Sequence, residues 1–243
     1  ETQVVELVRR GTIQSAIVSV GGISDRYPPI GVLNYPFRFR DLKEAYRVFD
    51  GPFGRMLGQD IEKKLDLAVL GYGDTGGLFV LTNSRRPVRN PADLAALRIR
   101  TMSLKSHQTL IQSLGAEPVT IGWSELYTAL RNGTVIGQMN PPSIILAGQL
   151  YRVQKYLTVT NHLYTPYIWI ANPAFLEKLS AADRDAVAKA AHAGVQASRE
   201  LAASQRPLDE LNGSMVIYHP TDAELKAFRD ATQPEMERFL RDT

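Results

Sequence analysis

The feature that most constrains the fold is the alternation of short apolar runs with capped, amphipathic helical segments along the whole chain. Residues 16–20, 97–101 and 167–171 have the length and composition of buried strands. Helical periods separate such runs, as in the segment that begins at Asp41, where Glu44 completes a capping box. This alternation predicts an α/β architecture with largely parallel sheets.

One predicted helix is unusually long and alanine-rich. Ser180 and Asp183 cap its start, it continues to about Leu211, and Pro207 bends it or ends it. Because roughly 30 helical residues span about 45 Å, we expect this helix to run along two lobes. We divide the chain into a first lobe of residues 1–77 plus 166–205 and a second lobe of residues 78–165 plus 206–243.

The composition excludes several classes of function. The 243 residues include no cysteine, so a thiol nucleophile, a disulfide framework and a cysteine-ligated zinc are excluded. The four histidines have no metal-binding spacing and no phosphate-binding loop is present, so we expect neither metal nor cofactor. The net charge of +3 is scattered in pairs such as Arg9 and Arg10, which argues against nucleic-acid binding.

A glycine pattern offers one alternative function. Gly71, Gly73 and Gly76 have the spacing of a dinucleotide-binding loop and follow a predicted strand. That loop requires a helix next, because the helix N-terminus holds the pyrophosphate. Residues 78–81 have the composition of a strand instead, which favours a flexible crossover between lobes. A nucleotide-binding, doubly wound enzyme therefore stays as the alternative.

Three strand-to-helix corners carry side chains suited to binding a small acid. Arg98 and Arg100 share one face of their strand, and Arg100 lies at its carboxyl end, where α/β proteins bind ligands. Trp123 and Asn140 occupy two similar corners. A solvated edge strand, a hydrophobic staple and a helix cap would explain these residues without a ligand. Together, a guanidinium, an amide and an aromatic wall predict a small organic-acid site.

Several motifs, in order over nearly the whole chain, resemble the DctP-like solute-binding proteins of TRAP (tripartite ATP-independent periplasmic) transporters. Each motif is weak alone, and they are specific together. They are YPF at 35–37, LTN at 81–83, NPADLAALRIR at 90–100, LGAEP at 114–118, WSELYTAL at 123–130, GQMNP at 137–141 and YRVQKY at 151–156.

The resemblance implies a periplasmic, two-lobed α/β binding protein with a ligand cleft between the lobes and a long helix across both. Such a protein is no enzyme. It would capture a small organic acid, close on it by hinge bending and deliver it to the membrane permease subunits of a TRAP transporter. We expect a monomer. A ligand-sensing partner of a membrane receptor is a further alternative on the same fold.

The resemblance also assigns roles to single residues. Arg100 matches the arginine that pairs with the ligand carboxylate, and Asn140 matches the asparagine that supports it. Trp123 stands where the family places an aromatic side chain beside the ligand. The positions that often line the cleft are Ser19, Ser103 and Tyr167.

The chain departs from the family pattern at three positions of the site region and at its start. Val80 stands where many members carry a second arginine, Met139 replaces a glutamate and Ile136 an aspartate. Because Val80 and Met139 make the pocket less polar, we expect a monocarboxylate with an apolar or aromatic body. Members also begin with a strand, a helix and a strand that are absent before residue 4, so we expect an N-terminal segment in the natural protein.

Overall fold

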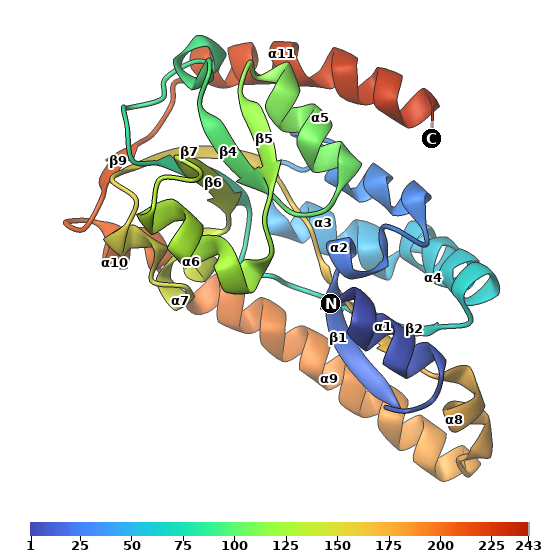
Figure 1. The fold of residues 1–243 in the computed structure, drawn as a ribbon. Helices are drawn as coiled ribbons and strands as arrows, with labels where there is room; N and C mark the ends of the chain where they lie inside the picture. Colours follow the sequence, from blue (N-terminus) through green and yellow to red (C-terminus); the bar gives the residue numbers. More distant parts are fainter. Residues whose placement is uncertain (243) are drawn as a thin grey trace. The chain divides into compact units, whose positions relative to one another are not determined.

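The computed structural model describes residues 1–242, which form two compact units. Unit 1 comprises Glu1–Ile30, Asp41–Thr75 and Thr165–Ser204, and unit 2 comprises Gly31–Arg40, Gly76–Tyr164 and the residues from Gln205 on. Each unit has its own sheet and its own helices, which are labelled in Figure 1. The α/β class predicted from the sequence is confirmed.

Unit 1 is built on a three-stranded sheet whose middle strand comes from far along the chain. Strand β8 (Tyr167–Ala171) lies between β1 (Ser15–Ser19) and β2 (Ala68–Gly73) and is antiparallel to both. The prediction of largely parallel sheets is therefore wrong for this unit. Its helices are α1 (Thr2–Arg9), α2 (Val20–Ile23), α3 (Leu42–Asp50), α4 (Pro52–Leu65), α8 (Pro173–Lys178) and α9 (Ala181–Ser204).

The long helix α9 is shorter than the sequence predicts. It has 24 residues, so its length is about 36 Å. The cap at its start is as predicted, because the Asp183 N–H donates to Ser180 Oγ at 3.1 Å. The helix ends at Ser204, and Pro207 opens the separate short helix α10 (Pro207–Leu211) of unit 2. The predicted break near Pro207 is thus confirmed.

Unit 2 is built on a six-stranded mixed sheet with the order β5-β4-β6-β3-β7-β9. Strand β4 is parallel to β5 and to β6, whereas β3 is antiparallel to β6 and to β7. The pair β7 and β9 is again parallel. The strands are β3 (Phe79–Asn83), β4 (Arg98–Thr101), β5 (Glu117–Thr120), β6 (Gly137–Asn140), β7 (Tyr156–Leu163) and β9 (Val216–Tyr218).

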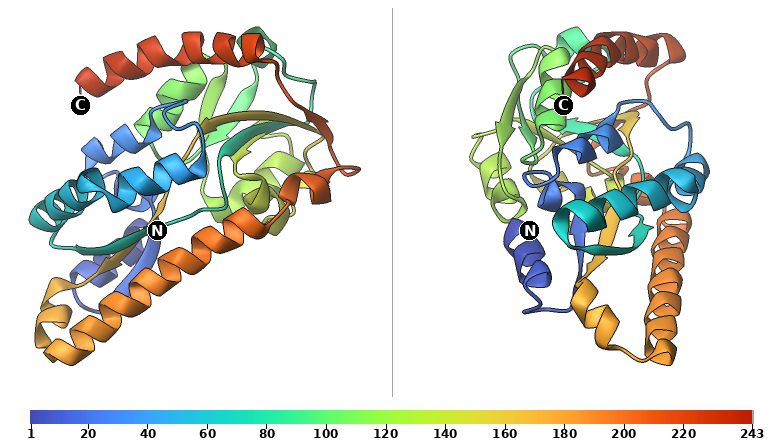
Figure 2. Two further views of the ribbon diagram at one scale, coloured as in Figure 1. Left: turned by 180° about the vertical axis from the view of Figure 1, so that it is seen from behind. Right: turned by 90° about the vertical axis from the view of Figure 1, so that its right-hand side faces the viewer.

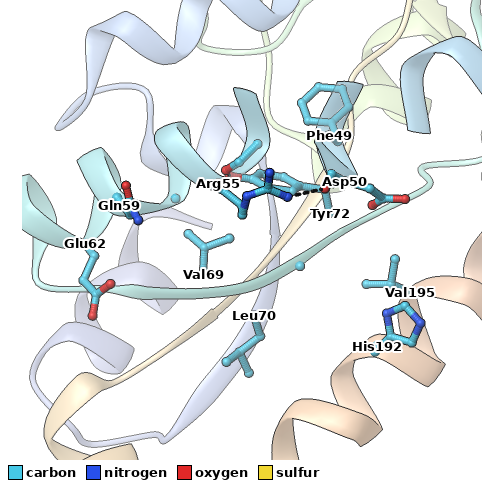
Figure 3. Close-up of a pocket in the computed structure, with 13 residues that line it drawn as sticks. Phe49, Asp50, Arg55, Gln59, Glu62, Val69, Leu70, Tyr72, His192 and Val195 are labelled. Atoms are coloured by element: carbon cyan, nitrogen blue, oxygen red, sulfur yellow. Dashed lines mark hydrogen bonds between the residues drawn. The ribbon is translucent and has the colours of Figure 1, made fainter. Parts of the chain in front are cut away.

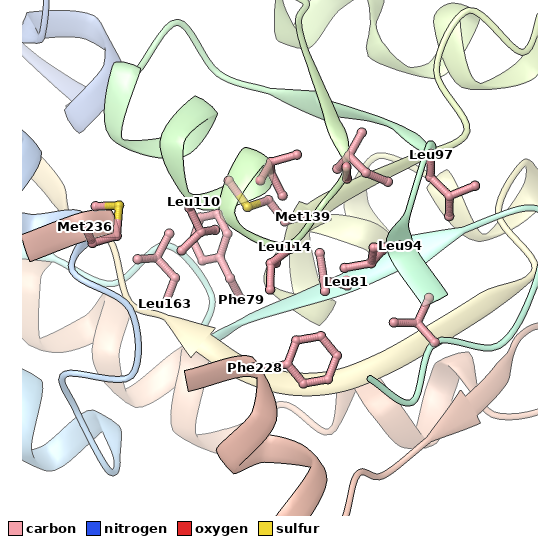
Figure 4. Close-up of a cluster of buried hydrophobic side chains, with 14 residues drawn as sticks. Phe79, Leu81, Leu94, Leu97, Leu110, Leu114, Met139, Leu163, Phe228 and Met236 are labelled. Atoms are coloured by element: carbon pink, nitrogen blue, oxygen red, sulfur yellow. The ribbon is translucent and has the colours of Figure 1, made fainter. Parts of the chain in front are cut away.

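Helices cover both faces of this sheet. Helices α5 (Lys105–Ser113) and α11 (Asp222–Arg241) lie side by side over one face (Figure 2). Beneath them is a hydrophobic cluster that includes Phe79, Leu110 and Phe228 (Figure 4). A second cluster packs the other face against α6 (Trp123–Arg131), α7 (Pro142–Ala147) and α10. Three 3₁₀ helices complete the elements: η1 (Pro28–Asn34), η2 (Pro91–Leu94) and η3 (Leu150–Arg152).

Residues 31–40 pack with unit 2, although our division of the sequence placed them in the first lobe. Two buried histidines of unit 2 hold this segment. Asn34 Oδ1 lies 2.9 Å from His107 Nε2, and the Phe37 N–H donates to the His162 carbonyl at 2.7 Å. The Tyr35 hydroxyl adds a hydrogen bond of 2.9 Å to the Glu237 carboxylate of α11.

The glycine pattern at 71–76 does not open a helix. Gly71 and Gly73 belong to β2, Gly76 has a φ of 109°, and the next element is strand β3. The fingerprint of a dinucleotide-binding loop lacks its helix here, as expected from residues 78–81. Within residues 1–242, none of the helices has both the length and the apolar character needed to cross a membrane.

Candidate ligand-binding site

Arg100 is a buried cation at the carboxyl end of an interior strand. Strand β4 lies between β5 and β6, and the Arg100 residue is only 4% exposed. Its Nε–H donates to the Ile121 carbonyl at 2.8 Å, which fixes the plane of the guanidinium. Arg98, two residues earlier, is exposed and donates to the Gly133 carbonyl. The strand is therefore not an edge strand as the explanation without a ligand supposed, and of the two arginines only Arg98 is solvated.

His107, a buried histidine that interacts electrostatically with Arg100, is neutral near pH 7. The pKa of His107 is lowered to about 3, chiefly by burial and also by the positive charge of Arg100 and by His162. His107 belongs to α5, and its Nε2 is engaged with Asn34. Neutral His107 therefore adds no positive charge beside Arg100 near neutral pH.

Asn140 lies on the same face of the sheet as Arg100 and is not a helix cap. Gln138 is the Cα partner of Arg100 across β4 and β6, and side chains two residues apart on a strand share a face. The residue that caps α7 is Pro141, whereas the Asn140 side chain turns back along its own strand. Its Nδ2–H donates to Gln138 Oε1 at 2.5 Å.

A chain of buried polar side chains continues from Asn140 across the sheet, and the sequence analysis missed it. Gln138 Nε2 donates to Thr82 Oγ1 at 2.9 Å, and Thr82 Oγ1 donates to Gln154 Oε1 at 2.9 Å. Gln154 Nε2 donates to the carbonyls of Ile136 and Val153. We call Asn140, Gln138, Thr82 and Gln154 the amide relay. All four residues are buried.

Trp123 is the first residue of α6, so it cannot be the staple residue that precedes a helix. It is 50% exposed, and its ring packs over Gly148 at the end of α7. A Cβ added at Gly148 would lie only 2.9 Å from Trp123 Cη2, so the glycine permits this close approach. Ser103 is an exposed residue of the turn between β4 and α5.

Val80 and Met139 face opposite sides of the unit 2 sheet. Val80 is the cross-strand partner of Asn140 and belongs to the cluster under α6 and α7. Met139 points the other way and packs in the cluster under α5 and α11, beside Phe79 and Leu110 (Figure 4). Because neighbouring residues of a strand alternate faces, Met139 does not line the surface that carries Arg100 and Asn140.

The remaining predicted residues, Ser19 and Tyr167, belong to unit 1 and are neighbours there. They are Cα partners at one end of the β1–β8 pair. Ser19 Oγ bonds the Glu1 carboxylate. Burial raises the pKa of the Tyr167 hydroxyl, and the Glu1 carboxylate raises it further. Six of the predicted residues therefore belong to unit 2 and two to unit 1; among them, Arg100, Asn140 and Val80 share one face of the unit 2 sheet.

Unit 1 also contains a cavity that holds none of the predicted residues. It has a volume of about 340 Å³ and lies between α4, β2 and α9 (Figure 3). Its wall includes Asp50, which takes two hydrogen bonds of 2.7 and 2.8 Å from the Arg199 guanidinium of α9. The same cavity is lined by Gln59, Glu62 and His192. Across residues 1–242, no three His, Cys, Asp or Glu side chains are grouped to hold a metal ion.

Comparison with known proteins places the chain in a family. Residues 1–242 match the model of the DctP family, bacterial extracellular solute-binding protein, family 7. A solute-binding protein from Verminephrobacter eiseniae is 37% identical over 199 residues, which are 82% of this chain and 59% of that protein. The 2,3-diketo-L-gulonate-binding periplasmic protein YiaO of Escherichia coli is 33% identical over 240 residues, 97% of this chain and 72% of its own length.

Solved structures agree with the sequence comparison. The crystal structure of a TRAP periplasmic solute-binding protein from Polaromonas sp. JS666, bound to D-erythronate, superposes with a TM-score of 0.92 at 32% identity. The match covers 100% of this chain and 80% of that chain. The chain therefore belongs to the DctP family of bacterial extracellular solute-binding proteins, a family of binding proteins and not of enzymes.

Proposed function

We propose that this chain captures a small organic monocarboxylate in the periplasm and delivers it to the permease of a TRAP transporter. The observation that carries this proposal is the buried guanidinium of Arg100, fixed at the carboxyl end of β4. A guanidinium binds a carboxylate with two parallel hydrogen bonds, and such a pair is strongest where water is excluded. Asn140, on the same face of the sheet, supplies an amide beside it.

The printed ligands of the two characterised proteins above support an acid as the ligand. One protein is named for 2,3-diketo-L-gulonate and the other is bound to D-erythronate. Both ligands carry a carboxylate, but they differ in the group next to it, which is an oxo group in the first. The relatives therefore support the class of ligand and leave open the chemistry beside the carboxylate.

For the rest of the ligand we propose a body with apolar or aromatic character. Val80 makes the surroundings of Asn140 apolar, although its side chain is fully buried in the cluster under α6 and α7. The half-exposed ring of Trp123 is an aromatic surface that could cover such a body. Met139 packs in the core on the opposite face of the sheet, so it does not make the site less polar.

Isothermal titration calorimetry of alanine variants at two neighbouring arginines tests the proposal. Arg100→Ala should weaken binding of a carboxylate ligand by about 30-fold to several thousand-fold, because it removes the partner of a buried charge at a cost of about 2–5 kcal/mol. Arg98→Ala is the matched control: it removes an exposed arginine from the same strand and should leave affinity unchanged. Equal affinities of Arg100→Ala and the parent protein would refute the proposal.

The delivery step is tested separately from binding. We propose that the chain acts as a monomer with the permease, with Ser19 and Tyr167 of unit 1 and Ser103 of unit 2 as further ligand contacts. Uptake of labelled acid by vesicles that contain the permease should require the added protein. Uptake that proceeds equally without it would leave the chain as a binding protein with another partner, such as a receptor.

A further inference from the structure

Two backbone carbonyls determine which group donates and which accepts in each hydrogen bond of the amide relay. The Nε2 of Gln154 donates at 3.1 Å to the Ile136 carbonyl and at 3.0 Å to the Val153 carbonyl. A carbonyl oxygen can only accept a hydrogen bond, so these two contacts need the amide nitrogen and fix which way the Gln154 amide points. The Gln154 Oε1 must therefore act as an acceptor.

Each further step of the relay follows from this one. Because Gln154 Oε1 accepts, the Thr82 hydroxyl donates to it, and Thr82 Oγ1 is left to accept. Gln138 meets Thr82 Oγ1 with its nitrogen, which turns Gln138 Oε1 towards Asn140. Asn140 in turn meets that oxygen with Nδ2. Reversing the Asn140 amide would place two oxygens against each other.

The end of the relay is therefore a fixed hydrogen-bond pattern on the face that carries Arg100. Asn140 uses one N–H for Gln138, and within residues 1–242 no hydrogen bond is made to its Oδ1. Oδ1 can accept from a ligand, and the second N–H can donate. Asn140 is 8% exposed, so an Oδ1 acceptor covered by a ligand without a donor would lose its contact with water.

A carboxylate alone does not match this pattern, because both of its oxygens are acceptors. It can take the guanidinium of Arg100 and the second N–H of Asn140, but it gives Oδ1 nothing. The nearest donor on a small acid is a hydroxyl on the carbon next to the carboxylate. Asn140 lies two residues beyond the partner of Arg100 on an adjacent strand, a separation of about 7 Å along and 5 Å across the sheet, which a small acid spans.

We propose that the ligand is a 2-hydroxy acid whose hydroxyl donates to Asn140 Oδ1, and that Gln138, Thr82 and Gln154 are positioning residues for this preference. The inference rests on the proposed capture of a carboxylate by Arg100. A 2-oxo acid presents an acceptor to Oδ1, and an unsubstituted acid leaves Oδ1 without a donor. A site built to bond a hydroxyl rejects analogues that lack it.

The test is calorimetry with three acids on one carbon skeleton: 2-hydroxy-3-methylbutanoate as separate enantiomers, 3-methylbutanoate and 3-methyl-2-oxobutanoate. One hydroxy enantiomer should bind at least roughly tenfold more tightly than the unsubstituted acid, the effect of leaving one buried acceptor unpaired. The oxo acid should bind no better than the unsubstituted acid. The parent protein suffices for this arm, so it does not depend on how a variant folds.

Breaking the relay at a distance tests its role as a positioning device. Thr82→Val keeps the volume but removes the hydroxyl, which frees Gln138 and Asn140 to reverse their amides. The preference for the hydroxy acid over the oxo acid should then fall severalfold, mostly through tighter binding of the oxo acid. Thr158→Val is the control, because Thr158 is another buried threonine of this sheet whose hydroxyl bonds the Val88 carbonyl outside the relay.

The outcomes separate this inference from the proposed function. The relay is supported if the parent protein binds the hydroxy acid more tightly than the other acids, if Thr82→Val reduces this preference, and if Thr158→Val preserves it. Equal or tighter binding of the unsubstituted or oxo acid, still abolished by Arg100→Ala, would overturn the hydroxy-acid inference alone. Hydroxy-acid preference that survives in Thr82→Val would overturn the positioning role. Binding of all these acids unaffected by Arg100→Ala would overturn both.

Discussion

Two buried arginines, one in each unit, are held by different kinds of partner. In unit 1, both terminal nitrogens of Arg199 donate hydrogen bonds to the Asp50 carboxylate, and one of them also donates to the Tyr72 carbonyl at 2.9 Å. The Arg199 guanidinium also stacks on the Tyr46 ring. In unit 2, the Nε of Arg100 bonds a backbone carbonyl, that of Ile121. The Asp50 carboxylate ties Arg199 to a neighbouring helix, and the Ile121 carbonyl fixes the plane of the Arg100 guanidinium.

The difference separates a structural arginine from a candidate binding arginine. The Arg199 fork closes on a carboxylate of its own unit, and the contact joins α9 to the end of α3. The Ile121 carbonyl fixes the plane of the Arg100 guanidinium, and Arg100 stands at the carboxyl end of an interior strand, where α/β proteins bind ligands. Burial alone would not distinguish the two residues, because both are almost fully covered. The place of each arginine in the fold is the informative observation: Arg199 joins two helices, whereas Arg100 ends a strand of the unit 2 sheet.

The largest expected effect concerns the neutral histidines of unit 2. Burial lowers the pKa of both His107 and His162 to about 3, from about 6.5 in an unfolded chain. Between pH 6.5 and pH 3 the unfolded state binds up to two more protons than the folded state. The free energy of unfolding is therefore highest above pH 6.5 and falls as the pH is lowered. The decline reaches at most about 2.7 kcal/mol per pH unit.

The chain's two tryptophans allow this to be measured unit by unit. Trp123 lies in unit 2 and Trp169 in unit 1, so urea unfolding of Trp169→Phe, followed by fluorescence, reports unit 2. His107→Gln should reduce the pH slope by about half, and His219→Gln, at an exposed position, should leave it unchanged. A slope that is flat from pH 7 to pH 5 would contradict the neutral buried histidines.

Arg199→Ala should destabilise the protein by about 1.5–3 kcal/mol, the range for hydrogen bonds to charged groups, since Asp50 is half-exposed and is rehydrated when its partner is removed. Urea unfolding followed at Trp169 in a Trp123→Phe background measures it. Arg100→Ala is the comparison, and its main effect should be on ligand affinity. The distinction between the two arginines fails if Arg199→Ala weakens binding as much as Arg100→Ala does.

Arg100→Lys asks whether charge alone is enough. Lysine keeps the positive charge but has neither a planar fork nor an Nε–H for the Ile121 carbonyl. Affinity for a monocarboxylate should fall at least tenfold, or about 1.4 kcal/mol, by calorimetry. Full affinity in this variant would show that the orientation set by Ile121 is irrelevant.

Tyr46→Phe should have the smallest effect. The Tyr46 hydroxyl donates to the Asp74 carboxylate at 2.6 Å, and its ring lies 4.5 Å from the Arg199 guanidinium carbon. Phenylalanine keeps the ring and removes one hydrogen bond, a loss of about 1 kcal/mol in the free energy of unfolding. Tyr46→Leu, which also removes the ring, should cost more. Equal losses would show that the ring adds nothing to Arg199.

Features that depend on nearby residues could be predicted from the sequence. The caps at Asp41 and Ser180 form as expected: the Glu44 N–H donates to the Asp41 carboxylate at 2.8 Å, and the Asp183 N–H donates to Ser180 Oγ at 3.1 Å. The place of Arg100 near the carboxyl end of its strand, two residues beyond Arg98, is also as predicted, because the bounds of this strand follow from local composition.

Features that depend on distant pairing could not be predicted. Strand β8 enters the sheet of unit 1 about 150 residues after β1, and no local pattern specifies its direction. The amide relay joins Gln138 to Thr82 and Gln154, which lie 56 residues before and 16 residues after it. One signal was available: Gln138 is two residues before Asn140 on a predicted strand, so the two share a face.

The central claim is that the guanidinium of Arg100 receives the carboxylate of the ligand. The most direct measurement is a ¹⁵N side-chain NMR spectrum of the protein during titration with 2-hydroxy-3-methylbutanoate, with the arginine Nε signals assigned through Arg100→Lys and Arg199→Lys. We predict that the Arg100 signal shifts on binding and that the Arg199 signal, already paired with Asp50, does not. Saturable binding with an unmoved Arg100 signal would contradict the account.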